Sequence, residues 1–261
     1  MSTVVAITSR ENALLQKLRK LTHDPGAYRR LGEIWLEGDH LCSALLSRGQ
    51  VPAHAVISES AWADTRLQAL ASRAPRVAVV PDALFRAMSG LESPAGMGML
   101  VHLPGAPSVQ PGVATVVLDR LQDAGNVGSI LRSASAMGFS QVVALKGTAG
   151  LWSAKVLRAG MGAHFGLRLI DAADPSTLES LDVPLVATSS HAGGVLGQVS
   201  LPVPCAWVLG HEGQGVAAEL LRRCALTVRI PQPGGEESLN VAAAAAVCLY
   251  ESARQGAGEK A

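Results

Sequence analysis

The chain has 261 residues, 48% of them hydrophobic and only 3% aromatic, with a formal net charge of +1. This composition excludes a disordered chain, and the small net charge argues against a heavily basic nucleic-acid-binding protein. The length favours two domains with cores built mainly from Ala, Val and Leu, as in closely packed α/β layers. Because no apolar run is long enough for a signal-peptide core or a bilayer span, we expect a soluble, cytoplasmic protein with no membrane contact.

Charge is concentrated near the beginning of the chain. Residues 1–30 contain six Lys and Arg residues against two acidic residues, which gives a local charge of +4. Such a cluster is typical either of a surface that meets a polyanion or of a solvated helix face. The sequence leaves both interpretations open.

The cysteines show neither CxxC nor His-paired spacing. They are Cys42, Cys205, Cys224 and Cys248. Their scatter predicts buried free thiols and indicates no metal site and no disulfide framework.

The first half of the chain predicts a small α/β domain that ends in a linker. Leu14, Leu15, Leu18 and Leu21 mark one apolar face of a helix. Strand-like runs at 32–38, 53–58 and 76–80 are separated by helical patterns at 40–49 and 62–73. Residues 102–112 hold three prolines and two glycines, which indicates a linker between the two patterned regions. We therefore expect domains at 1–105 and 106–261.

The second half predicts a parallel sheet covered on both faces. Short β-rich runs at 113–119, 141–145, 184–189, 205–210 and 226–230 alternate with helical stretches. Ligands in such sheets bind at the carboxyl ends of the strands. The unusual residues of this half follow three of these runs, so we expect the functional site there.

The glycines Gly210, Gly213 and Gly215 follow one of these strands. Their order, GxxGxG, differs from the GxGxxG dinucleotide fingerprint, and no phosphate-binding P-loop is present. A glycine-rich turn can instead offer bare backbone groups to a flat ligand, because the chain approaches closely without a Cβ atom. In the next such loop, Ser238 or Asn240 is expected to cap the small-residue helix that follows.

Three stretches of the second half resemble the ordered motifs of the SpoU/TrmH family of SPOUT RNA ribose 2'-O-methyltransferases. They are GNVGSILRSASAMGF (125–139), WVLGHEGQGV (207–216) and IPQPGGEESLNVAAAAAVCLYE (230–251). The resemblance covers residues 113–254 in order and spacing, with one departure at Gln232, where the family often has Met. The first half is similar to the family's substrate-binding domain. The stretches that carry this second resemblance are ITSRENALLQKLRKL (7–21), RRLGEIWLEG (29–38) and LFRAMSGLESPAGMGMLV (84–101).

The resemblance implies a trefoil-knotted α/β domain of the SPOUT type, an exception to the rule that chains do not thread loops, preceded by a small L30e-like α/β RNA-binding domain. It also implies a homodimer formed through the knot domain and S-adenosylmethionine bound in the knot. The implied cofactor contacts are the backbone at Gly210, Ile230 and Leu239, with Leu209 and Ser238 nearby. The implied active-site residues are Asn126, Arg132, Glu212 and Asn240. A further family stretch, 152–165, is expected to face the active site.

The implied chemistry needs no metal ion and no cysteine nucleophile. The sulfonium methyl is already electrophilic, so the enzyme must mainly place a ribose 2'-hydroxyl in line and ease removal of its proton. A guanidinium gives up a proton only at high cost, so our hypothesis is that Arg132 holds the RNA phosphate and the hydroxyl oxygen while the proton leaves to phosphate or water. Asn126 is expected to cap its helix and orient the site. Glu212 is expected to hold the guanidinium of Arg132 by a charge-assisted bond, unless the two form only a buried ion pair.

The implied substrate is ribosomal RNA, with transfer RNA as the alternative. An appended RNA-binding domain like residues 1–105 is frequent among the family's ribosomal RNA enzymes, whereas the short members tend to modify transfer RNA. A methyltransferase that protects the ribosome from an antibiotic is a narrower form of the same hypothesis. A non-catalytic RNA-binding or ribosome-assembly factor is the rival class, and the complete set of implied active-site residues argues against it.

Overall fold

The computed structural model describes residues 2–189, 192–234 and 238–258, and the chain divides into two compact units. The first unit comprises Met1–Gly105 and Trp152–Phe165, and the second comprises Ala106–Leu151 and Gly166–Ala261. The division after Gly105 falls within the linker predicted at 102–112. The stretch 152–165, however, groups with the first unit, although it lies within the range 106–261.

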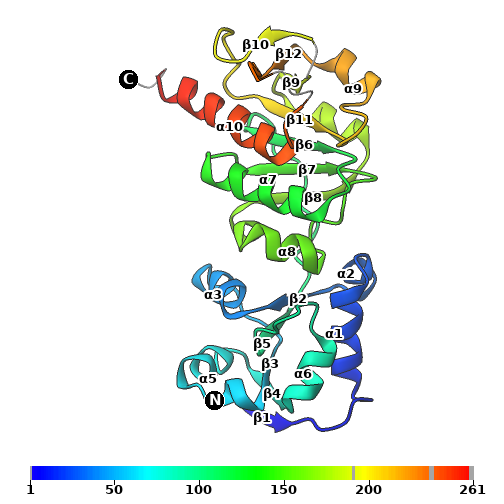
Figure 1. Ribbon diagram of the computed structural model, residues 1–261, viewed down its shortest axis with the longest axis vertical. Coiled ribbons are helices and arrows are strands. Elements are labelled where there is room, and N and C mark those ends of the chain that lie inside the picture. Colours follow the sequence, from blue (N-terminus) through cyan, green and yellow to red (C-terminus); the bar gives the residue numbers. More distant parts are fainter. Residues whose placement is uncertain (1, 190–191, 235–237, 259–261) are drawn as a thin grey trace. The chain divides into compact units, whose positions relative to one another are not determined.

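The first unit contains a five-stranded mixed sheet with the order β1-β4-β3-β5-β2, in which β5 runs antiparallel to both of its neighbours (Figure 1). Its strands are β1 (Thr3–Ala6), β2 (Glu33–Glu37), β3 (His54–Ser58), β4 (Arg76–Val80) and β5 (Met97–His102). Its helices are α1 (Ala13–His23), α2 (Ala27–Leu31), α3 (Asp39–Ser47), α4 (Glu59–Trp62), α5 (Thr65–Ala71), α6 (Asp82–Met88) and α8 (Ala154–Gly160), with the 3-10 helix η1 (Ala163–Gly166) following α8.

Local sequence signals explain where two of these helices begin. The side chain of Asn12 accepts a hydrogen bond from the backbone N–H of Leu14 and so caps α1. This helix buries Leu15, Leu18 and Leu21, as the spacing predicted. The helix predicted at 62–73 is confirmed as the shorter α5, which begins at Thr65 because Asp64 caps it by accepting from the backbone N–H groups of Arg66 and Leu67.

The second unit contains a seven-stranded, all-parallel sheet with the order β10-β12-β9-β11-β6-β7-β8. Its strands are β6 (Thr115–Asp119), β7 (Gln141–Leu145), β8 (Arg168–Ala173), β9 (Leu185–Thr188), β10 (Gly194–Val195), β11 (Ala206–Gly210) and β12 (Leu226–Arg229). Its helices are α7 (Ala124–Ala136), α9 (Ala218–Arg223) and α10 (Val241–Gly258), with the 3-10 helix η2 (Pro175–Leu181).

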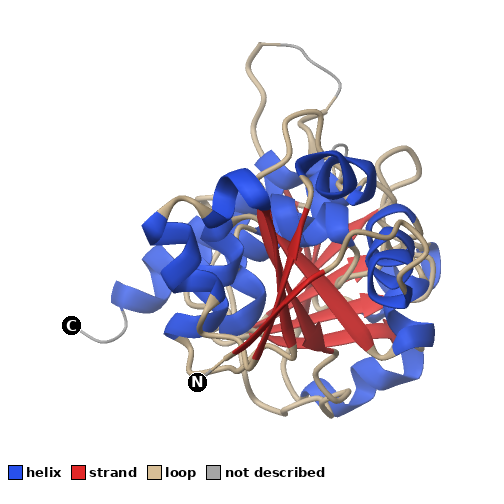
Figure 2. Cartoon of the chain, turned by 90° about the horizontal axis from the view of Figure 1, so that it is seen from below, coloured by secondary structure: helices blue, strands red, loops and turns tan. Residues whose placement is uncertain are grey.

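Helices lie on both sides of the parallel sheet, and Figure 2 shows strands enclosed by helices. Val117 and Val208 point to one face, where they pack in a core cluster with Leu220 of α9 and residues of η2. Trp207 points to the other face, where its indole N–H donates to the Ser252 hydroxyl of α10 at 2.8 Å. The predicted parallel α/β architecture is therefore confirmed, while the trefoil knot stays a prediction.

The cysteines are free thiols, as predicted, but only Cys42, Cys205 and Cys248 are buried, whereas Cys224 is half-buried. Burial raises the pKa of the Cys205 thiol to about 11 and that of Cys248 to about 12. Both thiols are therefore protonated at neutral pH, which makes them poor nucleophiles. Within the part of the chain that the structure describes, no helix is both long and apolar enough to cross a membrane.

Candidate active site

The carboxyl ends of β6, β11 and β12 lie at the same edge of the second sheet, because all three strands are parallel. Asp119 ends β6 and pairs in register with Gly210, which ends β11. Arg229 ends β12, and the chain then leads to the start of α10. The three motif-bearing loops therefore leave the sheet from one edge, as expected for a ligand site in an open α/β sheet.

Three polar side chains join these loops in one hydrogen-bonded chain. The Asn126 amide, at the start of α7, donates through Nδ2 to Glu212 Oε1 at 3.2 Å. The Asn240 amide, just before α10, donates through Nδ2 to Asn126 Oδ1 at 3.0 Å. The structure thus brings together Asn126, Glu212 and Asn240, three of the four predicted active-site residues, and their role in catalysis stays a prediction.

The Glu212 carboxylate also fixes the start of α7 through the backbone. It accepts hydrogen bonds from the backbone N–H groups of Gln122 at 3.2 Å and Asp123 at 3.1 Å. Burial raises the pKa of the Glu212 carboxyl, but its hydrogen bonds from backbone N–H groups and from the Asn126 amide outweigh this effect and leave the pKa below its usual value. Glu212 is therefore ionised at neutral pH and holds the β6–α7 loop against the loop after β11.

The helix caps differ in part from the sequence expectation. Asp123, not Asn126, caps α7, because its carboxylate accepts from the Asn126 backbone N–H at 2.7 Å. The expected cap at Asn126 is wrong, since this residue already lies inside the first turn. Of the two candidates for α10, Asn240 is the cap: its Oδ1 accepts from the backbone N–H groups of Ala242 and Ala243 at 2.9 and 3.3 Å. Ser238 is exposed and precedes the cap by two positions.

Arg132 lies apart from this hydrogen-bonded chain. It is exposed on α7, six positions after Asn126, which is about 9 Å further along the helix axis. The expected bond between Arg132 and Glu212 is wrong, because the carboxylate is taken up by Asn126 and by backbone N–H groups. Among the described residues Arg132 has no hydrogen-bond or ion-pair partner, so its guanidinium is available to a ligand.

Gly210 is required by the loop that follows it. A Cβ atom there would lie 2.1 Å from the backbone nitrogen of Val216 and 2.2 Å from the carbonyl carbon of Gly215. The chain folds back here, since His211 and Gly215 form a bridge. We expected this glycine to allow close approach of a ligand, but the group that first approaches it closely is the backbone of the chain itself.

An ion pair that was not predicted from the sequence anchors the same loop. Asp119 is buried and receives both Nε and Nη2 of Arg120, at 2.9 and 3.1 Å, together with the backbone N–H of Ala217 at 2.7 Å. Arg120 also donates through Nη1 to the Gln214 side chain at 3.1 Å. The signal in the sequence is an aspartate that ends an otherwise apolar strand, where a buried carboxylate needs such partners.

The described residues expected to contact the cofactor lie at or beside the strand ends and the start of α10. Leu209 and Gly210 are buried at the end of β11, and Ile230 is half-buried just after β12. The backbone N–H and C=O groups of Ile230 and Leu239 make no hydrogen bond to any described residue, so they are free for the edges of a base or ribose. Part of this loop, 235–237, lies outside the described residues. Within the described ranges no group of three or more His, Cys, Asp or Glu side chains is placed to hold a metal ion.

Comparison with known proteins identifies similar chains. The model of the SpoU rRNA Methylase family matches residues 114–250. The 23S rRNA (guanosine(2553)-2'-O)-methyltransferase RlmP of Bacillus subtilis is 28% identical over 247 residues, covering 94% of this chain and 97% of its own. The 23S rRNA (uridine(2479)-2'-O)-methyltransferase of Streptomyces viridochromogenes is 29% identical, covering 95% of this chain and 92% of its own.

Solved structures with a similar fold include an rRNA methyltransferase. A crystal structure of an AdoMet-bound rRNA methyltransferase from Sinorhizobium meliloti superimposes with a TM-score of 0.82 and 26% sequence identity. The superposition covers 96% of this chain and 98% of that chain, so the similarity extends over both units.

Proposed function

Because the chain belongs to the SpoU rRNA methylase family, we propose that it is an enzyme that transfers the methyl group of S-adenosylmethionine to a ribose 2'-hydroxyl in ribosomal RNA. The two full-length relatives described above are named as 23S rRNA 2'-O-methyltransferases. Their names specify a guanosine in one case and a uridine in the other, so the family alone does not assign the nucleotide. We also propose a cytoplasmic location, because ribosomal RNA is the proposed substrate.

The observation that carries the proposal is the hydrogen-bonded chain of Asn126, Glu212 and Asn240. It ties the three loops at the carboxyl ends of β6, β11 and β12 into one rigid edge. A binding module that only recognised RNA would have no need of a polar chain fixed inside these loops. An enzyme that must hold two reactants in line does need it, because small displacements of either reactant cost rate.

The chain's residues divide the work between the cofactor and the RNA. The backbone of Gly210, Ile230 and Leu239 would hold S-adenosylmethionine, with Leu209 and Ser238 alongside. When bound, S-adenosylmethionine supplies an electrophilic methyl group. The free guanidinium of Arg132 would bind the RNA phosphate and the 2'-hydroxyl oxygen, which places that oxygen and leaves its proton to phosphate or water.

Glu212 was expected to hold the Arg132 guanidinium, but its hydrogen bonds give it a different role. It fixes the start of α7 through Asn126 and the backbone, and Asn240 continues the same chain to α10. These three residues are positioning residues for the two loops that receive the reactants. Arg132 is then the residue proposed to touch the substrate.

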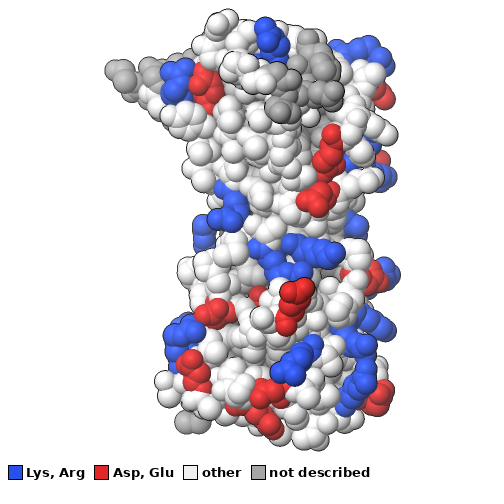
Figure 3. Space-filling model, viewed as in Figure 1, with Lys and Arg blue, Asp and Glu red and all other residues white. Residues whose placement is uncertain are grey.

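We also propose that the enzyme is a homodimer formed through its second unit. The first ten residues of α10, 241–250, hold no charged side chain. Val247 and Tyr250 on this helix are 42% and 56% exposed, which is unusual for large apolar side chains placed so close together. In the common view of Figures 1 and 3, the surface over the first part of α10 is uncharged, and charged side chains lie only toward its C-terminal end. Such a surface is suited to a second copy of the same helix.

Mapping of 2'-O-methyl groups tests the proposed function. Ribosomal and transfer RNA would be compared between a strain that contains the gene and one that lacks it. We expect one ribose in ribosomal RNA to lose its methyl group in the deletion strain and to regain it on complementation. A loss confined to transfer RNA would support the alternative substrate, and an unchanged map in both RNAs would overturn the proposal.

A further inference from the structure

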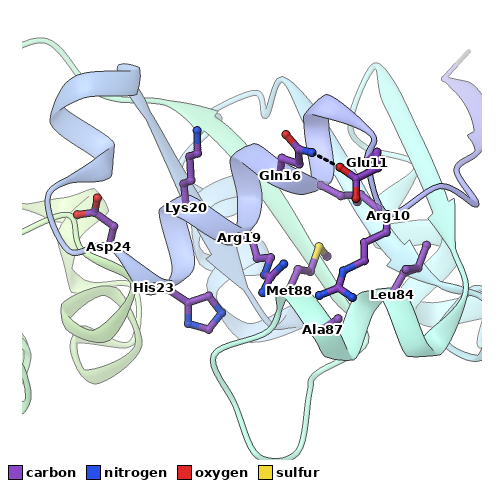
Figure 4. Close-up of a pocket in the computed structure, with 11 residues that line it drawn as sticks. Arg10, Glu11, Gln16, Arg19, Lys20, His23, Asp24, Leu84, Ala87 and Met88 are labelled. Carbon is purple, nitrogen blue, oxygen red and sulfur yellow. Dashed lines mark hydrogen bonds between the residues drawn. The ribbon is translucent and has the colours of Figure 1, made fainter.

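A surface hollow lies between α1 and α6 in the first unit (Figure 4). Its volume is about 580 Å³, within the range of roughly 300–1,000 Å³ that is usual for ligand pockets. Apolar side chains form part of its wall: Leu15 and Met88 are buried, Leu84 is half-buried and Ala87 is exposed. The hollow therefore offers an apolar surface at the exterior of a small domain.

Planar nitrogen-bearing side chains line the same hollow. Arg19 and His23 follow Leu15 at four-residue spacing on α1, so the three side chains share one helix face. Arg10 reaches in from the segment before the helix, and Figure 4 shows its guanidinium and that of Arg19 extending toward Met88. Arg10, Arg19 and His23 have no hydrogen-bond or ion-pair partner among the described residues.

The two acidic residues of the hollow are already engaged. Glu11 accepts a hydrogen bond from the Gln16 amide at 2.9 Å. Asp24 is paired with Arg30, which does not line the hollow. The backbone N–H of Gly26 and the guanidinium of Arg30 lower the pKa of the Asp24 carboxyl, so it stays ionised, and the positive charge of Arg30 balances it from outside the hollow. Glu11 keeps its negative charge, since the Gln16 amide is neutral, but Arg10, Arg19 and Lys20 outnumber it in the lining. Figure 3 shows Lys and Arg gathered along the side of the first unit where α1 runs.

We propose that this hollow binds one unstacked nucleotide of the RNA substrate, with the base against Met88 and Ala87 and with Arg10, Arg19 and His23 around it. The proposal rests on the proposed function, because it assigns the site at which the first unit holds the RNA. The hollow differs from a surface that binds only phosphates. Phosphate binding needs positive charge alone, whereas an apolar wall flanked by guanidinium and imidazole planes suits a base.

Chemistry favours a nucleotide over an acidic peptide as the ligand. Guanidinium and imidazole planes stack on bases, and guanidinium groups also donate to phosphate oxygens, so Arg10 and Arg19 can serve both parts of one nucleotide. An acidic peptide would use the charges but would leave the apolar wall uncovered. Sequence-selective proteins bind RNA mainly through unstacked bases in single-stranded regions. This hollow can admit such an unstacked base.

The test compares two double variants of the full-length protein. In the pocket variant, Arg10→Gln and Arg19→Gln remove two charges from the hollow. In the control variant, Arg48→Gln and Arg73→Gln remove two charges from exposed positions of the same unit that do not line it. The RNA probes are a short single-stranded RNA of mixed sequence and a duplex of the same length, and S-adenosylmethionine binding and thermal unfolding verify that each variant is folded.

We expect the pocket variant to bind the single strand about ten- to a hundredfold more weakly than the control variant, and to bind the duplex like the control. Ala87→Glu, which places a carboxylate in the hollow, should act in the same direction, whereas Ala83→Glu, one turn earlier and outside the lining, should not. Equal losses on single strand and duplex would overturn the proposal, because phosphate contacts would then explain them. Unchanged single-strand binding in a folded pocket variant would also overturn the proposal.

Methyl transfer by the wild-type enzyme to 23S rRNA, measured alongside, tests the proposed function separately from the pocket.

Discussion

At the scale of single residues, Arg132 and Asn240 separate the two tasks of the site. Asn240 belongs to the hydrogen-bonded chain that fixes the loops, and Arg132 is exposed and unpaired among the described residues. Both residues were predicted from the resemblance and from their place after a strand. The absence of a bond between Arg132 and Glu212 could not be predicted from the sequence. It depends on how far along α7 Arg132 lies from Asn126.

We expect Arg132→Lys to bind S-adenosylmethionine normally and to transfer the methyl group about a hundred- to a thousandfold more slowly. Lysine keeps the positive charge but loses the planar fork that can bind phosphate and hydroxyl oxygen together. The loss of two or three transition-state hydrogen bonds at about 1.5 kcal/mol each gives this rate effect. Single-turnover methylation of unmodified 23S rRNA measures it. A wild-type rate in the variant would show that Arg132 supplies only diffuse charge.

Two substitutions at Asn240 distinguish its capping from its positioning role. Asn240→Ala removes the cap of α10 and the bond to Asn126, so we expect about 1 kcal/mol lower stability together with a lower rate. Asn240→Asp keeps a good cap but cannot donate to Asn126 Oδ1, so it should restore the stability and leave the rate low. Thermal unfolding and single-turnover rates measure the two effects. If both recover in Asn240→Asp, the residue acts only as a cap.

At the scale of elements, the β-branched runs predicted β2, β3, β4, β6, β7, β9, β11 and β12. The other strands were missed for different reasons. Strand β1 (TVVA) is β-branched but has only four residues, all of them exposed, at the edge of the sheet. Strand β10 has two residues, and β5 (MGMLVH) contains only one β-branched residue. Strand β8 begins with Arg and contains Asp, and its burial varies along its length. These strands are specified by their neighbours in the sheet, which no local pattern reveals.

The loop after β11 gives a prediction at this scale. Gly210→Ala places a Cβ atom against the backbone of Gly215 and Val216, so the loop must move and we expect S-adenosylmethionine binding to be lost. Gly213→Ala is the matched control in the same loop, because its Cβ would meet only the His211 ring, at 3.9 Å. Calorimetric titration with S-adenosylmethionine compares the two variants. Equal affinities in both would show that the conformation of this loop does not determine cofactor binding.

At the scale of the whole molecule, the sequence indicated the linker and the two-part organisation, but not the membership of 152–165 in the first unit. This stretch is separated from residues 1–105 by β6, α7 and β7 of the second unit, so its grouping depends on tertiary packing. Val156 and Leu157 of α8 are buried, which is a reason to test function on the full-length chain. The assignment of substrate binding to 1–105 and catalysis to 106–261 stays a prediction.

Dimer formation is also tested on the whole molecule. We expect Tyr250→Glu to convert the dimer to a monomer, because it places a charge on the apolar face of α10 where a second copy would pack. Leu221→Glu is the control, since Leu221 is an exposed apolar residue of a different helix, α9. Sedimentation velocity distinguishes the species. A monomeric wild type would contradict the proposed dimer. A Tyr250→Glu variant that remains dimeric would show that the interface lies elsewhere.

Methyl transfer by the purified full-length protein tests the central claim most directly. Unmodified 23S rRNA and transfer RNA would be incubated separately with S-adenosylmethionine that carries a labelled methyl group, and the labelled nucleotide would be identified by mass spectrometry after digestion. The account predicts label on the 2'-oxygen of one ribose in 23S rRNA, dependent on Arg132. Label on a base, or no transfer to either RNA by a protein that binds the cofactor, would contradict it.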